Sequence, residues 1–321
     1  MNFSKDILTI DAQKTCQEIC DFIKHQVFNQ FKKEGAVVGL SGGIDSALTV
    51  SLCVKTLGKE KVLGIILPEK ESNPKSFPYA KKLAEKLEIE TEIVDISPML
   101  ESLGAYQRRD EIIKRIFPEY DQSYKSKIGL PQNLLDKNRF NIFLLEIEDK
   151  NGNQKQARLS KYDLLGIVAA TDMKQRTRMT NLYYFAEKNN YIVAGTTNKS
   201  EVEQGFYVKY GDGGVDIEPI AHLYKTQVYQ LAKYLEVPEE IIKRTPSPDT
   251  FPSEVSDQEF YFCLPYDTLD LLLYAWEKKV PHSQISEILE LTQEQIKRVF
   301  RDFESKKKAT THLGILPPTL E

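Results

Sequence analysis

The segment from Ala36 to Leu57 constrains the fold of this chain more than any other. Its first residues, 36–40, are apolar and mostly small or β-branched, which predicts a buried strand of a parallel sheet. From Ala47 onward, apolar residues recur at a helical spacing as far as Leu57. Between strand and helix lies Ser-Gly-Gly-Ile-Asp-Ser, residues 41–46. Such a strand–loop–helix unit presents free backbone N–H groups and the positive end of a helix to an anion.

The loop at 41–46 differs from the common phosphate loops. No lysine follows Gly42 and Gly43, and neither Gly-x-x-x-x-Gly-Lys-Ser/Thr nor Gly-x-Gly-x-x-Gly is present here. The two glycines allow the backbone to approach a phosphate, but Asp45 would repel a polyphosphate unless a metal ion lay between them. We therefore expect a pyrophosphate loop that works with Mg²⁺. The alternative is a glycine turn that only leads into an N-capped helix.

Composition fits a globular enzyme. The 321 residues are 41% hydrophobic and 28% charged, and the formal net charge of −4 does not indicate a nucleic-acid-binding surface. No apolar stretch approaches the ~20 residues that span a membrane, and the N-terminus has no signal-peptide pattern. We expect a cytoplasmic protein that binds neither membranes nor nucleic acid. Its cysteines, Cys16, Cys20, Cys53 and Cys263, are expected to be buried thiols.

Strand and helix patterns alternate along the chain and predict an α/β fold, with a doubly wound, mainly parallel sheet and helices on both faces. We expect one domain over residues 1–321, with an insertion at about 104–160 and a C-terminal helical extension at about 255–321. Besides 36–40, strands are expected at 61–67, 92–96 and 191–194. Helices are expected at 11–33, 76–88, 162–188, 223–235, 266–278 and 283–304.

The insertion interrupts the alternation of strands and helices. A short basic helix is expected at 106–118, and a β-hairpin is expected at 139–160. A long insertion is more often a lid or a contact surface than a catalytic element.

Three further features carry chemistry. Glu201 follows the strand at 191–194 and is a candidate second Mg²⁺ ligand, although a glutamate near a helix N-terminus can also be merely solvated. Lys225 in the first turn of a helix opposes the helix dipole, so a phosphate partner would explain it better than solvent would. Residues 203–220 contain four glycines among charged residues, and polar, glycine-rich loops that follow strands usually carry function.

Five motifs stand in the order seen in NAD⁺ synthetases. They are residues 41–46, Lys-Gln-Arg-Thr-Arg-Met at 174–179, Gly-Thr-Thr-Asn-Lys-Ser-Glu at 195–201, Lys-Tyr-Gly-Asp-Gly-Gly-Val-Asp at 209–216, and Leu-Tyr-Lys-Thr-Gln at 223–227. The first resembles the pyrophosphate loop of all N-type ATP pyrophosphatases, whereas the fourth is far more specific. The resemblance runs from about residue 15 to the C-terminus. It implies an adenine nucleotide alpha hydrolase-like fold and a homodimer with deamido-NAD⁺ near the interface.

The resemblance also implies a reaction and a set of site residues. Members of the family join ammonia to the nicotinate carboxylate of deamido-NAD⁺ with ATP, through an adenylate, and release NAD⁺, AMP and pyrophosphate. The implied ATP contacts are Gly39, Leu40, Ser41, Gly42, Gly43, Ile44, Asp45, Ser46, Thr196, Lys225 and Ser247, of which Asp45, Lys225 and Ser247 are assigned to catalysis. Asp45 and Glu201 would bind Mg²⁺. Arg176, Lys209, Asp216 and His312 would contact deamido-NAD⁺.

Two positions depart from the family pattern. Leu313 and Gly314 follow His312 where Lys-Arg is usual, so the three lysines at 306–308 are an alternative contact. Pro248 follows Ser247 where alanine is usual. No amidohydrolase domain precedes the core, so we expect the chain to use ammonia and not glutamine. A separate glutaminase could supply that ammonia in trans.

Two other functions stay open on the residues alone. One is another AMP-forming pyrophosphatase, such as an RNA thiolase or a lysidine-type tRNA ligase. The lack of Cys-x-x-Cys and the acidic balance count against it. The other is a nucleotide-binding module without catalysis. Asp45 together with Glu201 counts against that function, because a sensor does not need a metal-bound leaving group.

Overall fold

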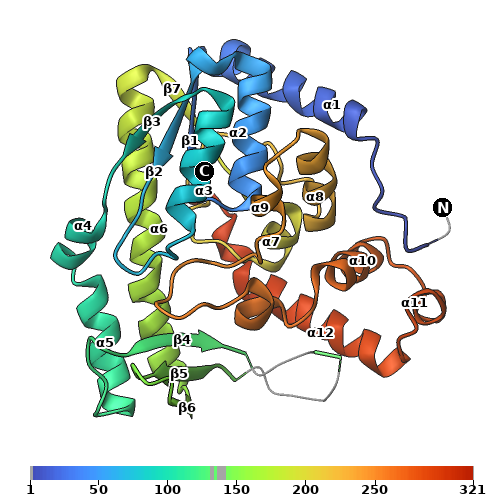
Figure 1. Ribbon diagram of the computed structural model, residues 1–321. Coiled ribbons are helices and arrows are strands. Elements are labelled where there is room, and N and C mark those ends of the chain that lie inside the picture. The colour runs from blue at the N-terminus through green and yellow to red at the C-terminus, as the bar shows by residue number, and fades with distance from the viewer. Residues whose placement is uncertain (1–2, 131–133, 136–141, 321) are drawn as a thin grey trace.

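A computed structural model describes residues 3–130, 134–135 and 142–320 (Figure 1). Its central sheet has the strand order β3-β2-β1-β7, and every neighbouring pair is parallel. The strands are β1 (Gly35–Gly39), β2 (Val62–Ile66), β3 (Glu90–Ile93) and β7 (Tyr191–Ala194). Along β1, Ala36 and Val38 point into one core and Val37 into another, and all three are fully buried. The strand is therefore apolar on both faces, as the segment at 36–40 predicts.

Helices cover both faces of this sheet, so the expected α/β fold is confirmed. One face carries α1 (Ala12–Lys24) with its continuation His25–Gln30, α2 (Ile44–Leu57), α3 (Ser76–Leu87), α8 (Lys225–Tyr234) and α9 (Glu239–Ile242). The other carries α4 (Ser97–Ser102), α5 (Ala105–Ile116) and α6 (Lys161–Asn189). The four cysteines are buried thiols outside any disulfide, as expected. Among the described residues, none of the helices has the length and apolarity to cross a membrane.

Some element boundaries differ from the expected ones. The third strand lies at 90–93 rather than 92–96, because the apolar Ile96, which is fully buried, packs below α4 after the strand has ended. The helix expected at 11–33 has α-helical geometry only to Lys24 and ends its continuation at Gln30, and Phe31 after it is 41% exposed. The helix expected at 283–304 is two helices, α11 (His282–Leu289) and α12 (Gln293–Thr310), and Glu290 between them has φ +56°.

The insertion contains a third strand beside the expected hairpin. Strands β4 (Lys125–Gly129), β5 (Leu144–Glu148) and β6 (Gln154–Arg158) form an antiparallel sheet in that order. The sequence pattern misses β4 because Lys125, Ser126 and Lys127 make it polar. Residues 139–141 of the expected hairpin lie outside the described residues. The core of this sheet includes Phe251 and Val255, which belong to a distant segment of the chain.

A further core lies at the C-terminal end. Helices α10 (Tyr266–Glu277), α11 and α12 pack there with Phe3 and Leu8 from the N-terminus. Figure 1 shows these helices below α7 (Lys199–Gln204) and α8, on the side where the parallel strands end. The site described next lies at that end of the sheet.

Candidate active site

The loop at 41–46 joins the end of β1 to the start of α2, and it is closed by its own hydrogen bonds. Gly42 has φ +72°, and a Cβ added there would lie 2.4 Å from the carbonyl oxygen of Ser76, so both conformation and space require glycine. The backbone N–H of Gly43 donates to Ser41 Oγ (3.2 Å), and Ser46 Oγ donates to the Gly43 carbonyl (3.0 Å). Ser41 is exposed, so the loop offers an anion an open side. Of the other residues predicted to contact ATP here, Gly39 ends β1, Leu40 is buried and Ile44 begins α2.

Lys225, Asp45 and Glu201 come together beside this loop. Lys225 Nζ donates to Asp45 Oδ2 at 2.5 Å and lies 3.6 Å from Glu201 Oε1, although the Lys225 side chain is only 1% exposed. Burial alone would lower the pKa of Lys225, but the two carboxylates outweigh burial and raise it. Burial, and after it the charge of Asp45, raises the pKa of Glu201 well above its ordinary value. Neither Lys225 nor Glu201 is a solvated helix-end charge.

A capping box fixes Glu201. Asn198 Oδ1 accepts from the Glu201 N–H (3.2 Å), and Glu201 Oε2 accepts from the Asn198 N–H (3.1 Å). Asn198 also donates from Nδ2 to Asp45 Oδ1 at 3.0 Å, so this one residue contacts both carboxylates, Asp45 through its side chain and Glu201 through its backbone N–H. Our sequence reasoning did not single out Asn198. The Asn-x-x-Glu spacing before a helix was a signal that could have found it.

Helix α10 supports the same site from the C-terminal part of the chain. Asp270, fully buried, accepts from Ser200 Oγ (2.6 Å) and from the Thr226 N–H (2.7 Å). Tyr266 OH donates to Asp257 Oδ2 at 2.9 Å, and burial raises the pKa of Asp257. Nothing local in the sequence marks these residues, because their role depends on a contact between distant segments.

The carboxylates fit a divalent cation. Asp45, Glu201 and Asp257 all act electrostatically on the single ammonium of Lys225, so carboxyl groups outnumber ammonium groups at this buried position. In the described part of the chain, no group of three His, Cys, Asp or Glu side chains is arranged to hold a metal by itself. Mg²⁺ commonly takes one or two carboxylates and completes its shell with phosphate oxygens and water. Asp45 and Glu201 suit that kind of site.

Three of the residues predicted to bind the acceptor meet at the loop 203–220. Arg176, on α6, donates from Nε to the Lys209 carbonyl at 3.3 Å. Lys209 Nζ donates to the carbonyls of His312 (2.9 Å) and Ile315 (2.8 Å). The C-terminal tail therefore returns to Lys209 through its backbone, while the His312 side chain is exposed.

Asp216 lies apart from that group. Its Oδ1 accepts from Tyr183 OH (3.1 Å) and its Oδ2 from the Val193 N–H (2.7 Å), so it ties α6 to β7. Nearby, the Glu218 carboxyl packs so closely on Gly195 that a Cβ there would lie 2.5 Å from it. Burial raises the pKa of Glu218 to about 8. Glu218 was not predicted as a site residue.

The segment at 245–257 is linked to the loop at 41–46 through Arg244 and Ser76. Arg244, just before it, donates from Nη1 to the Gly42 carbonyl (3.1 Å) and from Nη2 to Ser76 Oγ (2.8 Å). Ser247 is half-buried in this segment, and its Oγ accepts from the Asp249 N–H at 3.2 Å. Thr196 is half-buried two residues before Asn198. Arg244 belongs to no motif and was not predicted.

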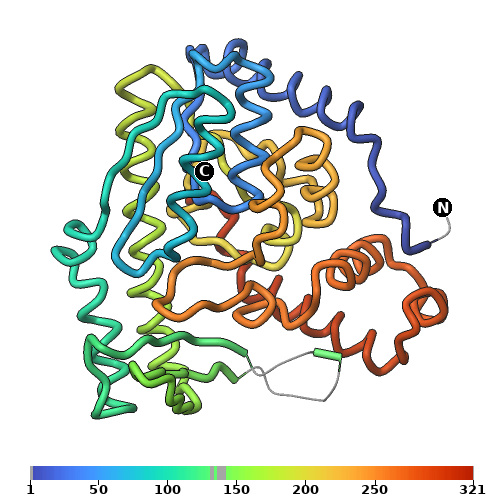
Figure 2. The backbone as a smooth tube through the Cα atoms, in the orientation of Figure 1, coloured from blue at the N-terminus to red at the C-terminus, as the bar shows by residue number. Residues whose placement is uncertain are grey.

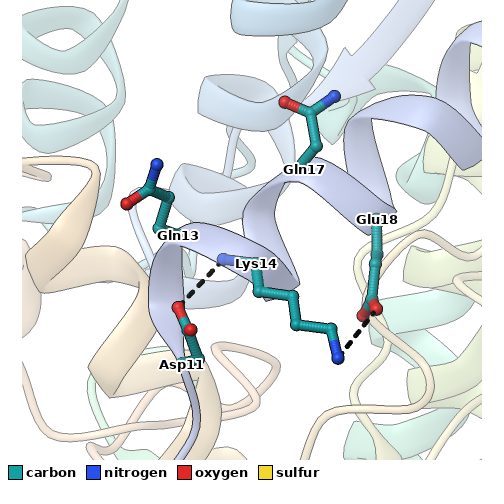
Figure 3. A pocket seen from close by; sticks show the side chains of 5 residues that line it. All are labelled: Asp11, Gln13, Lys14, Gln17 and Glu18. Carbon is teal, nitrogen blue, oxygen red and sulfur yellow. Dashed lines mark hydrogen bonds and ion pairs between the residues drawn. The ribbon is translucent and has the colours of Figure 1, made fainter.

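A hollow on α1 is not part of this site. Figure 3 shows the residues that line it: Asp11, Gln13, Lys14, Gln17 and Glu18. Asp11 accepts from the Lys14 N–H (3.0 Å) as the helix N-cap, and Lys14 pairs with Glu18 at 3.9 Å. These contacts belong to the first turns of one surface helix, and they point to no ligand.

Comparisons with known proteins agree on one family. The NAD synthase family matches residues 15–128 and 109–310. Similar proteins include an "NH(3)-dependent NAD(+) synthetase" of Mesorhizobium japonicum, 42% identical over 311 residues and 97% of both chains. Another protein of that name, from Thermotoga maritima, is 38% identical over 86% of this chain and 95% of its own.

Solved structures extend the comparison to the fold. An NH3-dependent NAD synthetase from Campylobacter jejuni is 27% identical, with a TM-score of 0.63, covering 97% of this chain and 100% of its own. An NMN synthetase from Francisella tularensis reaches a TM-score of 0.68 over 97% of this chain and 99% of its own. At 24% identity, that second likeness shows the fold alone.

Proposed function

The chain belongs to the NH3-dependent NAD⁺ synthetase family, a family of ligases, and we propose the residues with which it joins ammonia to deamido-NAD⁺. The observation that carries the proposal is the buried contact of Lys225 with Asp45 and Glu201 beside the loop at 41–46. That arrangement places a cation and two carboxylates at a candidate phosphate site, within a chain whose relatives carry the name of this activity.

In the first step, an oxygen of the nicotinate carboxylate attacks the α-phosphorus of ATP. The bond from that phosphorus to the bridging oxygen breaks, and pyrophosphate leaves. The backbone N–H groups of residues 41–46 and the N-terminus of α2 would hold the leaving pyrophosphate. Lys225 would neutralise the charge that develops on it, and Thr196 and Ser247 would contact ATP. Phosphoryl and nucleotidyl transfer need this kind of positioning and charge stabilisation more than a nucleophilic side chain.

In the second step, ammonia attacks the acyl carbon of the adenylate, AMP leaves with the bonding electrons, and one proton is released. Arg176, Lys209, Asp216 and His312 would hold deamido-NAD⁺ in both steps. Arginine and lysine suit its pyrophosphate or carboxylate groups, since both are anionic. The hydrogen bond from Arg176 to the Lys209 backbone supports the action of these two residues on one ligand.

Mg²⁺ would be held by Asp45 and Glu201. When bound, the ion supplies charge neutralisation for the phosphate oxygens. The excess of buried carboxylates over ammonium groups at this point supports the assignment.

A second copy of the chain would complete the enzyme. The outer face of α6 leaves large side chains in solvent, with Tyr162 75%, Leu165 56% and Tyr184 60% exposed. The family resemblance implies a homodimer with deamido-NAD⁺ near the interface. Exposed apolar side chains on the helix that carries Arg176 support that arrangement. Analytical ultracentrifugation at micromolar protein concentration would detect the dimer, and a monomer under turnover conditions would contradict this arrangement. The buried thiols outside any disulfide fit the reducing cytoplasm.

A chromatographic assay of the purified chain tests the reaction. With deamido-NAD⁺, ATP, Mg²⁺ and ammonium, we expect NAD⁺, AMP and pyrophosphate in equal amounts. Glutamine in ammonia-free buffer should give none. Nicotinate mononucleotide as a competing acceptor should react at least ~10-fold less efficiently, because it lacks the adenylate half that a dinucleotide site would bind. Formation of ADP and phosphate, or a preference for the mononucleotide, would refute this assignment.

A further inference from the structure

A cluster of buried charges lies outside the candidate site residues named above. Lys174, on α6, is 2% exposed, and its ammonium donates to three oxygens at once. These are Glu69 Oε1 (2.7 Å), Glu71 Oε2 (2.7 Å) and the carbonyl of Thr250 (2.8 Å). The Glu69 side chain is fully buried and that of Glu71 is 12% exposed. All three donor positions of this ammonium are therefore used by the chain itself.

The insertion supplies the rest of the cluster. Arg109, on α5, binds Glu71 through both terminal nitrogens, at 2.5 and 2.7 Å, and Tyr106 OH donates to Glu69 Oε2 at 2.7 Å. Burial would raise the pKa of Glu71, but Arg109 and Lys174 outweigh it and lower that pKa to about 2. We call Glu69, Glu71, Arg109 and Lys174 the latch.

The latch joins four segments that are distant in sequence. Glu69 and Glu71 lie in the loop that leaves β2, Thr250 lies in the segment at 245–257, and the cations come from α5 and α6. Figure 2 shows the segment at 245–257, in orange, passing between the end of α3 and the sheet of the insertion. Hydrogen bonds anchor it on both sides: Asn73 N–H to Asp249 Oδ1 (2.7 Å) and Ser253 N–H to the Ser126 carbonyl (3.3 Å).

From the latch, hydrogen bonds continue to the phosphate loop. Asp249, the neighbour of Thr250, accepts from Ser76 Oγ at 2.7 Å. Ser76 Oγ also accepts from Arg244, and Arg244 donates to the Gly42 carbonyl. No member of the latch touches the phosphate loop directly. The latch binds Thr250 and thereby limits where the segment at 245–257, which carries Ser247, can lie.

A buried ion cluster is poor evidence of stability, since desolvation of the charges cancels much of their attraction. Its geometry, by contrast, is demanding, because each carboxylate must meet its cation at hydrogen-bond distance. An apolar cluster of equal volume would fill the same space without fixing the two loops so closely.

We propose that Lys174 is a positioning residue for ATP. Through the latch it holds the loop at 68–75 and the segment at 245–257 against each other, and so sets Arg244 and Ser247 over the phosphate loop. The insertion helix α5 completes the latch through Arg109, which gives the insertion the role of a brace for the nucleotide side of the site. This inference rests on the proposed function only in taking the nucleotide to be ATP.

The test separates positioning from stability. Lys174→Met leaves two buried carboxylates with the single cation of Arg109 in the latch, so this variant should have a lower Tm. In the double variant Glu69→Gln/Lys174→Met, the formal charges of the latch again balance, so most of the Tm should return. ATP affinity should stay weak in both variants, because neither restores the three donor contacts. We expect KM for ATP to rise by about 10- to 100-fold, while KM for deamido-NAD⁺ changes less than about 3-fold.

Binding of ATP with Mg²⁺, measured by calorimetry without deamido-NAD⁺, gives the same comparison independently of turnover. It therefore distinguishes failure of the latch from failure of the proposed reaction. Lys188→Met, at an exposed lysine of the same helix, is the matched control and should leave Tm and both KM values unchanged. A double variant with restored Tm and wild-type ATP affinity would show that the latch is only structural. An equal rise in both KM values would also overturn the proposal.

Discussion

The two sides of the candidate site are built in opposite ways. On the phosphate side, Asp45, Glu201 and Lys225 are largely buried and already in contact, with the lysine only 1% exposed. On the acceptor side, the Arg176 side chain is 46% exposed, and the Lys209 ammonium donates to two backbone carbonyls of the tail and lies over the Tyr210 ring. The contacts on the proposed phosphate side are therefore already formed within the fold, whereas the side chain of Arg176 on the proposed acceptor side is partly open to solvent.

The difference follows from what each side must do. Charge that develops on a leaving pyrophosphate is stabilised best by groups fixed beforehand in a dry environment. Such groups must carry their own counter-charges, because an unpaired buried charge is strongly destabilising. Recognition of a large, flexible dinucleotide can use exposed side chains, which order when the ligand binds. Mutations on the two sides should therefore affect different kinetic parameters.

The largest effect should come from the phosphate side. We expect Asp45→Asn and Glu201→Gln to lower kcat by on the order of 10³-fold, since each removes a charge that fits Mg²⁺ and the leaving group, a loss of several kcal/mol. Pyrophosphate release at saturating Mg²⁺ measures this. Circular dichroism should show a folded protein in both cases. Near-normal turnover of either variant would remove that residue from the site.

On the acceptor side, Lys209→Ala should raise KM for deamido-NAD⁺ by about 10- to 100-fold and leave KM for ATP within about 3-fold, because one charge-assisted contact is lost. Steady-state kinetics with each substrate varied in turn would measure both. Lys243→Ala, at a lysine whose side chain is 73% exposed, is the control. An equal rise in both KM values would show that Lys209 does not act on the acceptor side alone.

A smaller effect is expected from the tail. A chain ending at Thr311 lacks the carbonyls of His312 and Ile315, which hold the Lys209 ammonium. The loss of two exposed hydrogen bonds should raise KM for deamido-NAD⁺ by about 3- to 10-fold, less than removal of the lysine itself. An unchanged KM would mean that the tail has no part in placing Lys209. A KM as high as that of Lys209→Ala would show that the tail contributes more than these two carbonyls, as the proposed direct contact of His312 with the ligand would.

The smallest effect concerns Glu218, which packs on Gly195 from the acceptor loop and so lies between the two sides. Its pKa is about 8 in the folded chain, against an ordinary 4.5. Between those values the unfolded chain has lost the proton that the folded chain keeps, so stability falls as pH rises. Glu218→Gln should therefore raise Tm relative to the wild type more at pH 8.5 than at pH 5, by about 2–4 °C. A Tm difference that is the same at both pH values would show that Glu218 does not titrate in this range.

Local patterns in the sequence predicted much of the fold. The strand–loop–helix at 36–57 and the strand at 191–194 lie where expected, because burial on both faces selects continuous apolar runs and glycine is needed at Gly42. The capping box of Thr292 and Gln295 starts α12, and its Thr-x-x-Gln spacing is a local signal of that start. Strand β4 was not predicted because its own residues are mostly polar, and the break at Glu290 lies inside a stretch whose apolar spacing predicted one helix.

The same distinction holds for the site. The sequence by itself determined which residue types line the phosphate loop and that Asp45 needs a cation nearby, since a carboxylate in such a loop would otherwise repel its ligand. Only the tertiary structure decided that Lys225 sits between Asp45 and Glu201, that Asn198 contacts both carboxylates, and that Lys174 binds loops 180 positions apart. Glu69 and Thr250 are brought together by the parallel sheet and its crossovers. Contacts of that kind depend on how segments pack in space, and no spacing along the chain records them.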